Sequence, residues 1–408
     1  MVNSNDTPDG SVASVSAESI LRMRSYRLDR LRQELARSDF GACILFDPNN
    51  IRYATDSRNM HIYTLRWPFR YVFIPTSGPV TLFEYFGSEH LSADLETIQE
   101  IRPAQAWDFP SAADAVDERI EQFAREILDL VAATCGSNRR IALDRLDHRV
   151  VTALVSHGLK VFPVDEASEN ARKIKSKEEI ECMRLGVQVT QTGLAKMKEA
   201  LRPGISENEL WSILHQTNIS MGGEWIETRL LNSGHRTNPW FQESSARRIN
   251  DGDLVAIDTD LFGPFGYGCD MSRTWRCGDG KPTGAQKQLY QLAYENVHHN
   301  KELIKPGVSF AELVQKSWQM PEIYLPRRYS KIAHGAGVGF EYPNIPYRED
   351  WDKYGFDGMI EEGMVFCVES YIGHPNGVEG VKLEQQVLVT RNGNEVLSDF
   401  PFESELLC

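Results

Sequence analysis

The sequence lacks any arrangement of cysteines that indicates a disulfide framework or a thiolate zinc site. Its seven cysteines are scattered along 408 residues, are odd in number and form no Cys-x-x-Cys pair. The first twenty residues lack the apolar core of a signal peptide. These absences favour a reducing compartment, so we expect a cytoplasmic protein whose residues 1–20 form a disordered arm.

Positive charge is also scarce. The chain contains 44 Lys and Arg residues against 58 Asp and Glu residues, which gives a formal net charge of −14 at pH 7. Such a charge disfavours nucleic acid and anionic membranes as partners. The apolar content of 41% and the charged content of 25% are ordinary for a soluble globular protein, and the length favours two domains.

The hydrophobic pattern predicts an N-terminal α/β domain over residues 21–170. It predicts helices over 21–41 and 113–133 and strands over 42–46, 71–74, 80–83 and 140–143, with a turn at 47–50. A second domain is expected over 171–408. Its first helix begins near Ser176, because Ser176 followed by Glu179 is a capping box.

The second domain repeats part of its own sequence. Residues 203–210 recur as 306–313, and both copies place a Pro-Gly turn before a Ser with a Glu three residues later. Residues 249–258 likewise recur as 360–369, and each copy ends in a carboxylate. The repeat predicts a pseudo-twofold domain with metals bound between its two halves.

Six side chains of this second domain form a candidate ligand set, and each lies at or near the end of an apolar run. They are Asp258, Asp260, Asp270, His334, Glu369 and Glu384. Five carboxylates in one place repel one another unless cations neutralise them, and oxygen ligands with one imidazole suit hard or borderline divalent ions. The set therefore predicts two bound metal ions.

Strand geometry supports this prediction. Asp258 and Asp260 are two residues apart, so both point the same way in an extended strand. The glycines that follow them allow a hairpin that returns Asp270 beside them. Glu384 is expected to face Glu369 across a pair of strands.

The order Asp, Asp, His, Glu, Glu resembles that of the pita-bread metallohydrolases, which include methionine aminopeptidase, prolidase and creatinase. Residues 270–274, Asp-Met-Ser-Arg-Thr, look like the second-aspartate motif of that superfamily. The resemblance implies a mixed α/β (α+β) chain with a creatinase-like N-terminal domain and a pita-bread C-terminal domain. It also implies two divalent metal ions per chain and a homodimer.

Three departures separate the sequence from the peptidases of this superfamily. Trp240 follows Pro239 where those peptidases usually have a His, and Glu341 stands seven residues beyond His334 where they have another. Both imidazoles that polarise a scissile amide are therefore missing. The third departure is one extra residue between Asp258 and Asp270, which correspond to the first and second metal aspartates of the superfamily. This extra residue makes room for Asp260.

All three departures resemble the DddP-type dimethylsulfoniopropionate lyases, and longer runs resemble them at 224–229, 237–243 and 380–386. Tyr329, five residues before His334, matches a tyrosine that those lyases use near the substrate. The resemblance implies iron as the metal, with Mn, Zn, Co and Ni as alternatives. In one respect the chain differs from these lyases, because Phe340 stands where they carry an aspartate base.

Elimination of dimethyl sulfide requires removal of a weakly acidic proton next to a carboxylate, and bound metals can neutralise that carboxylate. The candidate bases are Glu341, Tyr329 and a hydroxide held by the metals. Aromatic faces suit the sulfonium cation, at ~1–2 kcal/mol each when desolvated. The candidate aromatic side chains are Tyr63, Trp67, Trp240, Phe340 and Tyr342.

We therefore expect a two-metal lyase that acts on a small carboxylate such as dimethylsulfoniopropionate. The alternative is a metal-dependent hydrolase of C–N bonds, with an Xaa-Pro dipeptide or a small amide as substrate. The missing histidines count against that alternative, and Phe340 counts in its favour. A binding protein that has lost its activity is a third possibility, disfavoured because every ligand position is filled.

Overall fold

The computed structural model describes residues 15–67 and 69–407. Within these ranges the chain divides into two compact units, one formed by Ser16–Arg172 and one by the residues from Lys173 onward. Most of the predicted arm, residues 1–14, lies outside the described residues. Among the described helices, none is both long enough and apolar enough to cross a membrane.

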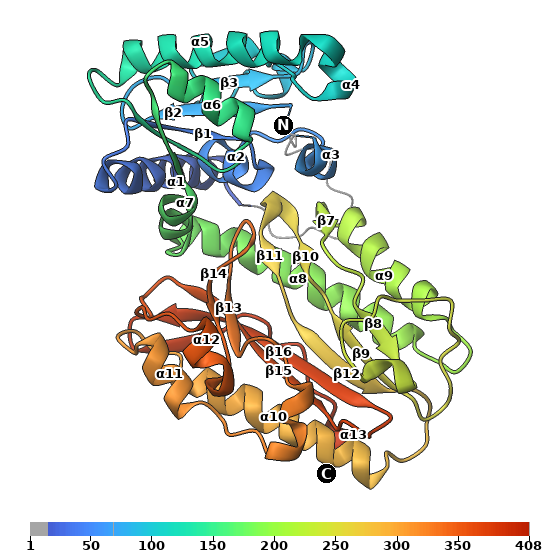
Figure 1. Cartoon of the computed structure of the whole chain (residues 1–408). Helices are drawn as coiled ribbons and strands as arrows, with labels where there is room; N and C mark the ends of the chain where they lie inside the picture. The colour runs from blue at the N-terminus through green and yellow to red at the C-terminus, as the bar shows by residue number, and fades with distance from the viewer. Residues whose placement is uncertain (1–14, 68, 408) are drawn as a thin grey trace. The chain divides into compact units, whose positions relative to one another are not determined.

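The N-terminal unit is built on a six-stranded mixed sheet with the order β4-β3-β2-β1-β5-β6. Its strands are β1 (Ala42–Leu45), β2 (Tyr71–Pro75), β3 (Thr81–Glu84), β4 (Glu100–Pro103), β5 (Arg140–Leu143) and β6 (Lys160–Pro163). Its helices are α1 (Ala17–Arg37), α2 (Pro48–Thr55), α3 (His61–Arg66), α4 (Phe109–Ala112), α5 (Val116–Thr134), α6 (His148–Ser156) and α7 (Asp165–Arg172), with short 3-10 turns at Glu89–Leu91 and Ala113–Ala115. Helices α1 and α5 cover opposite faces of the sheet (Figure 1).

The four predicted strands of this unit are confirmed, and two details of the prediction are wrong. Helix α1 spans Ala17–Arg37 rather than 21–41, and it begins early because the Ser16 side chain accepts a hydrogen bond from the Ser19 amide and caps the helix. The predicted turn at 47–50 is the start of α2. There the Asp47 side chain accepts from the Asn49 amide and Pro48 stands in the first turn, which together form a helix start signal.

A buried acidic side chain in this unit is surrounded by arginines. The carboxylate of Asp56 lies 2.8 Å from Arg24, 3.1 Å from Arg27 and 2.9 Å from Arg52. All of these side chains except Arg24 are almost fully buried. The unit therefore neutralises this carboxylate with its own residues.

The C-terminal unit contains three sheets with the orders β11-β10-β7, β12-β9-β8 and β14-β13-β15-β16-β17. Its strands are β7 (Trp225–Ile226), β8 (Leu231–Ser233), β9 (Leu254–Asp258), β10 (Leu261–Phe262), β11 (Gly268–Cys269), β12 (Ser272–Arg276), β13 (Ala333–Ala336), β14 (Phe340–Ile345), β15 (Val365–Gly373), β16 (Gly380–Thr390) and β17 (Gly393–Val396). Its helices are α8 (Lys177–Ala200), α9 (Glu207–Ser220), α10 (Gly284–Leu303), α11 (Phe310–Lys316), α12 (Trp351–Tyr354) and α13 (Ser404–Leu407), with 3-10 turns at Gly234–Thr237, Pro264–Gly266, Glu322–Arg327 and Arg348–Asp350.

The predicted repeat is visible as matching backbone hydrogen bonds. The Gly204 amide donates to the Ile249 carbonyl at 2.8 Å, and the Gly307 amide donates to the Ile360 carbonyl at the same distance. In both copies the isoleucine amide also donates a hydrogen bond of 2.9 Å to the carbonyl of the residue that follows the glycine. Each isoleucine leads into a strand that carries an acidic side chain of the candidate site, β9 in the first half and β15 in the second.

The two halves meet where β12 and β16 run side by side (Figure 1). The Thr274 hydroxyl of β12 donates to the Lys382 carbonyl of β16 at 2.9 Å and accepts from the Lys382 amide at 3.1 Å. This junction fixes the distance between the acidic side chains of the two halves. The candidate site therefore lies between the halves, as the repeat predicts.

Candidate metal centre

The strand register brings the predicted acidic residues together. Ser272 of β12 pairs with Asp258 at the end of β9, so Asp270, just before β12, lies close to Asp258. Glu369 of β15 pairs directly with Glu384 of β16, which confirms that these two side chains face each other. The hairpin between β10 and β11 provides the predicted return of the chain.

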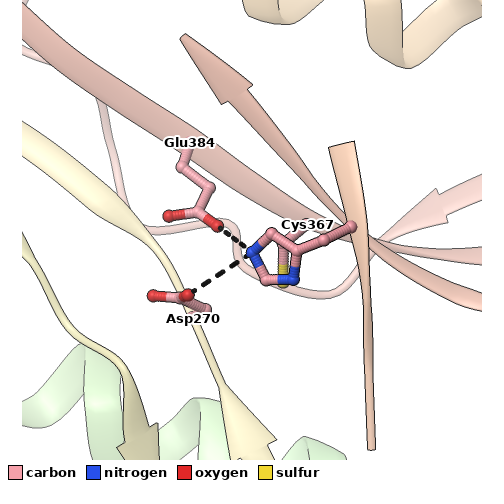
Figure 2. Close-up of side chains that lie close together, drawn as sticks. Asp270, Cys367 and Glu384 are labelled. Atoms are coloured by element: carbon pink, nitrogen blue, oxygen red, sulfur yellow. Dashed lines mark ion pairs between the residues drawn. The ribbon is translucent and has the colours of Figure 1, made fainter. Parts of the chain in front are cut away.

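The candidate ligand atoms form two groups that share Glu384. Asp270, His334, Cys367 and Glu384 make up the first, here called the His334 group, and Asp258, Glu369 and Glu384 make up the second, the Asp258 group. Within each group the ligand atoms lie within 4.8 Å of one another, and all of these residues are buried. Figure 2 shows the carboxylates of Asp270, from the connection between β11 and β12, and of Glu384, from β16, converging on one point.

The imidazole of His334 is oriented for ligation. Its Nδ1 lies 3.0 Å from the Gly335 carbonyl, a contact that requires an N–H at Nδ1 and leaves Nε2 as the free acceptor. Nε2 lies 3.2 Å from Glu369 and 3.8 Å from both Asp270 and Glu384. Such a hydrogen bond to the second ring nitrogen is usual for metal-bound histidine.

The electrostatics of the site favour additional positive charge. Burial and the neighbouring carboxylates raise the pKa of Asp270 and of Glu384 well above their usual values. Glu384 Oε1 is buried and accepts no hydrogen bond from any described residue. A buried carboxylate oxygen without a partner, beside an oriented imidazole, fits a divalent metal ion.

For Asp260 the structure corrects the argument from strand geometry. Strand β9 ends at Asp258, and Asp260 has a φ of 37°, a left-handed conformation that is unfavourable for a residue with a side chain. Its amide donates to Asp270 at 3.0 Å, and Thr228 donates to its carboxylate. Burial, with a contribution from Asp258, raises the pKa of Asp260 to about 7. Asp260 thus lies beside the ligands in a turn, and its role as a ligand stays a prediction.

The prediction from the sequence did not include two side chains of the site, Lys382 and Cys367. Lys382 is fully buried, and its Nζ lies 3.1 Å from Asp258 and 3.6 Å from Glu384. Cys367 joins the His334 group. Lys382 precedes Glu384 by two residues and Cys367 precedes Glu369 by two, so the two-residue period of a strand was a usable signal for both.

Two predicted aromatic residues lie around Lys382. Its Nζ is 4.7 Å from the centre of the Tyr329 ring and 6.0 Å from that of Trp240. Tyr329 stacks on Phe241 with ring centres 5.3 Å apart, and Trp240 packs on Tyr371. Burial, with a contribution from Glu369, raises the pKa of the Tyr329 phenol. Tyr329 also lines a cavity of about 640 Å³.

Phe340 and Glu341 are adjacent in β14 but have different surroundings. The Phe340 ring stands edge-on to the His334 ring, with centres 5.5 Å apart. The Glu341 carboxylate lies 2.7 Å from the Lys175 ammonium, and both side chains are buried. Phe340 therefore contacts the His334 group, whereas Glu341 is held in an ion pair.

Of the remaining predicted aromatic residues, Tyr342 lies in β14, whereas Tyr63 and Trp67 belong to the N-terminal unit. Tyr63 lies in α3, and Trp67 follows that helix and stacks on Phe69 with ring centres 5.9 Å apart. Tyr63 is exposed over 47% of its surface. No observation within that unit tests their predicted contact with the substrate.

Known proteins resemble the chain in both sequence and fold. The model of metallopeptidase family M24 matches residues 181–391. The chain is 37% identical over 400 residues to dimethylsulfoniopropionate lyase DddP of Roseovarius nubinhibens, covering 97% of this chain and 90% of the relative. The corresponding lyase of Roseobacter denitrificans is 34% identical over the same share of each chain.

Peptidases are also similar to the chain. An Xaa-Pro dipeptidase of Pyrococcus furiosus is 30% identical over 246 residues, covering 60% of this chain and 68% of the relative. The solved structure of an Xaa-Pro dipeptidase from Bacillus anthracis has a TM-score of 0.75 at 21% identity, covering 93% of this chain and 99% of that one. This structural likeness confirms the predicted prolidase-like fold. The chain therefore belongs to metallopeptidase family M24 and, within it, to the family of the DddP dimethylsulfoniopropionate lyases.

Proposed function

We propose that this protein is a metal-dependent lyase that cleaves dimethylsulfoniopropionate into acrylate and dimethyl sulfide. The observation that carries the proposal is the extent of the likeness. Similarity to the lyases covers 97% of the chain, whereas similarity to the Pyrococcus furiosus dipeptidase covers 60%. The site supports the same choice, because Trp240 and Glu341 occupy the places where peptidases of the superfamily carry histidines.

We propose two divalent metal ions per chain as the cofactor, with iron as the metal. The residues that would hold them are Asp258, Asp260, Asp270, His334, Glu369 and Glu384. Such ions supply Lewis-acid chemistry that neutralises the substrate carboxylate and the negative charge that develops beside it. The unpartnered oxygen of Glu384 and the orientation of His334 support this assignment.

The reaction needs a base, an anchor for the carboxylate and a surface for the sulfonium. The base removes a proton from the carbon next to the carboxylate, that electron pair forms the C=C bond, and the C–S electron pair leaves with dimethyl sulfide. Lys382 supplies a buried positive charge beside the acidic residues. Of the predicted aromatic residues, Trp240 near Lys382 and Phe340 beside His334 are the proposed faces for the sulfonium.

Tyr329 and Glu341 are the candidate bases in the chain itself. The Tyr329 ring lies 4.7 Å from the Lys382 ammonium, which places this residue beside the acidic side chains. The Glu341 carboxylate is bound to Lys175 at 2.7 Å. We therefore propose Tyr329 as the side chain that handles the proton and Glu341 as the second candidate.

A paired assay tests the proposal. Metal-loaded protein is supplied with dimethylsulfoniopropionate and, separately, with Gly-Pro and other Xaa-Pro dipeptides, while headspace dimethyl sulfide and free amino acid are measured. We expect dimethyl sulfide release that Tyr329→Phe reduces more strongly than Glu341→Gln does. Dipeptide cleavage with kcat/KM above ~10⁴ M⁻¹s⁻¹, the range of an ordinary enzyme, would show that the lyase assignment is wrong.

One observation favours hydrolysis of a C–N bond as the second candidate function. The Phe340 ring lies against His334, at a position where the lyases carry an aspartate. An aromatic ring cannot accept a proton from the substrate. The same dipeptide assay, extended to small amides, tests this alternative.

We also propose that the protein is homodimeric and cytoplasmic and has no nucleic-acid partner. Residues 21–170 and 171–408 form its two domains. The aromatic residues Tyr63 and Trp67 are proposed as further contacts of the substrate. The resemblance to creatinase-like proteins supports the dimer, and the net charge of −14 supports the absence of nucleic acid. Light scattering after size-exclusion chromatography measures the oligomeric state, and elemental analysis of purified protein identifies the metal.

A further inference from the structure

Phe241 combines features that a purely structural ring does not need. Its side chain is exposed over 58% of its surface, although the preceding residue, Trp240, is buried. Its φ of 71° is a left-handed conformation, which is unfavourable for a residue with a bulky side chain. Its ring stacks on that of Tyr329, with ring centres 5.3 Å apart. Backbone strain of this kind is concentrated at functional sites, so the exposed ring is a candidate for binding a ligand.

The chain on either side of Phe241 is held firmly. Glu207, at the start of α9, is fully buried. It accepts hydrogen bonds from the amide and hydroxyl of Ser233, at 2.9 and 2.8 Å, and from those of Ser245, at 3.0 and 2.6 Å. One carboxylate therefore ties together both ends of the 233–245 segment. Because the segment is anchored, its exposed ring loses less entropy when a ligand binds.

The ring on which Phe241 stacks already has a cation beside it. The Lys382 ammonium lies 4.7 Å from the centre of the Tyr329 ring, and it repels any second cation on that ring. Two methylene groups separate the carboxylate of dimethylsulfoniopropionate from its sulfonium. A substrate that directs its carboxylate towards Lys382 and the metal centre therefore directs its sulfonium outwards. The exposed ring of Phe241, stacked on Tyr329, offers an aromatic face further out.

We propose that Phe241 is a substrate-binding residue that recognises the sulfonium cation through the face of its ring. The inference rests on the proposed lyase function and names a specificity-determining residue of the same site. A cation over an aromatic face is attracted by the ring quadrupole. The sulfur loses its positive charge as the C–S bond breaks, so this attraction stabilises the bound substrate more than the transition state. Phe241 therefore lowers KM and does not raise kcat.

The test compares two carboxylates of the same shape that differ in charge. One is trimethylammoniopropionate, and the other is its neutral isostere, in which a quaternary carbon replaces the nitrogen. Calorimetry measures the binding of each to metal-loaded wild-type protein and to Phe241→Leu, which keeps an apolar side chain and the same backbone cost but has no aromatic face. We expect wild-type protein to prefer the cation. Phe241→Leu should reduce that preference at least ~3-fold, as expected for the loss of an exposed cation–π contact.

The headspace assay provides a kinetic measurement on the same preparations. In Phe241→Leu the KM for dimethylsulfoniopropionate should rise at least ~3-fold, while kcat stays within about twofold of the wild-type value. A residue that only supports the structure of the site would lower kcat as well.

Two variants serve as controls. Phe241→Tyr retains an aromatic ring and should retain the preference for the cation. Phe86→Leu makes the same change at a ring of the N-terminal unit that is exposed over 92% of its surface, and it should leave the preference and KM unchanged. If Phe241→Leu does not fold, Phe241→Met removes the ring in its place.

The outcomes distinguish this inference from the proposed function. Equal affinity of wild-type protein for the two analogues overturns the inference, and so does a preference that Phe241→Leu leaves unchanged. An equal loss of affinity for both analogues in Phe241→Leu shows a structural role and also overturns it. A preference that falls in Phe241→Leu and persists in Phe241→Tyr establishes that the ring recognises the cation. Release of dimethyl sulfide by wild-type protein decides the lyase proposal separately.

Discussion

The two units of this protein bury acidic side chains in opposite ways. In the N-terminal unit, Asp56 stands alone among Arg24, Arg27 and Arg52. Burial by itself raises the pKa of Asp56, but the three arginines outweigh it and hold the pKa well below its usual range. The unit therefore contains all the positive charge that its buried carboxylate needs.

In the C-terminal unit the balance is reversed. Five acidic residues share the site with one lysine and one imidazole, and burial raises the pKa of Asp270 and Glu384. Two divalent ions together with the ammonium of Lys382 carry as many positive charges as five carboxylates carry negative ones. The comparison shows that a structural carboxylate is neutralised from within the chain, whereas this cluster is built to bind cations from solution.

The largest expected effect is the loss of a ligand. Asp270→Ala or Glu384→Ala should reduce metal content and should lower lyase activity to background, well beyond the ~10–100-fold cost typical of changes around a metal site. Elemental analysis and the headspace assay measure the two quantities. Asp352→Ala, an exposed change in the same unit, is the control. Full activity in thoroughly metal-stripped wild-type protein would contradict this prediction.

Asp56→Asn should have the next largest effect, on stability alone. The change leaves buried arginines without their carboxylate, and breaking a buried ion pair typically costs ~3–5 kcal/mol. Urea unfolding, with hydrogen exchange followed in peptides of residues 16–172, measures the loss. Asp29→Asn on the exposed face of α1 is the control, and metal content should not change in either variant.

The pH dependence of this stabilisation has a definite sign. Because the folded protein lowers the pKa of Asp56, it binds this proton less readily than the unfolded chain does. The stabilisation is fully present above the unfolded value of ~4 and is lost as the pH falls towards the folded value. Wild-type and Asp56→Asn proteins should therefore differ in stability at pH 7 and converge below about pH 4. A difference that persists unchanged at pH 2.5 would exclude an electrostatic origin.

Metal removal should affect only the unit that binds metal. A ligand at 100 times its dissociation constant stabilises the folded state by about 2.7 kcal/mol, so chelation should lower hydrogen-exchange protection in β9, β13, β15 and β16 by a comparable free energy. Peptides of residues 16–172 should keep their protection. Equal losses in both units would show that the difference between them does not come from the metal.

Phe340→Asp adds a sixth carboxylate to the cluster and has the smallest expected effect. The new side chain stands beside His334, where an aspartate can take the proton of the substrate. We expect dimethyl sulfide release to rise at least ~10-fold, which corresponds to about 1.4 kcal/mol, with metal content retained. Phe340→Asn is the matched control, because asparagine is similar in shape to aspartate but cannot act as a base. An equal gain in both variants would exclude a role for the new carboxylate as base.

The sequence alone determined the framework of this site. Strand periodicity and the internal repeat predicted that Glu369 and Glu384 face each other and that two similar halves meet at the centre. Both predictions are confirmed by the register of β15 with β16 and by the paired backbone bonds of the two halves. These features follow from a periodic pattern and a repeat along the chain, so they can be predicted from the sequence.

Only the tertiary structure decided the electrostatic roles around that framework. Lys382 is two residues from a predicted ligand, yet its contact with Asp258 depends on the meeting of β16 with β9 and β12. Glu341 was a candidate base in the sequence, and its ion pair with Lys175 joins residues far apart in the chain. Asp260 leaves the strand because the backbone turns there. Charge in a buried site depends on every neighbour in three dimensions, and the order of residues along the chain does not specify those neighbours.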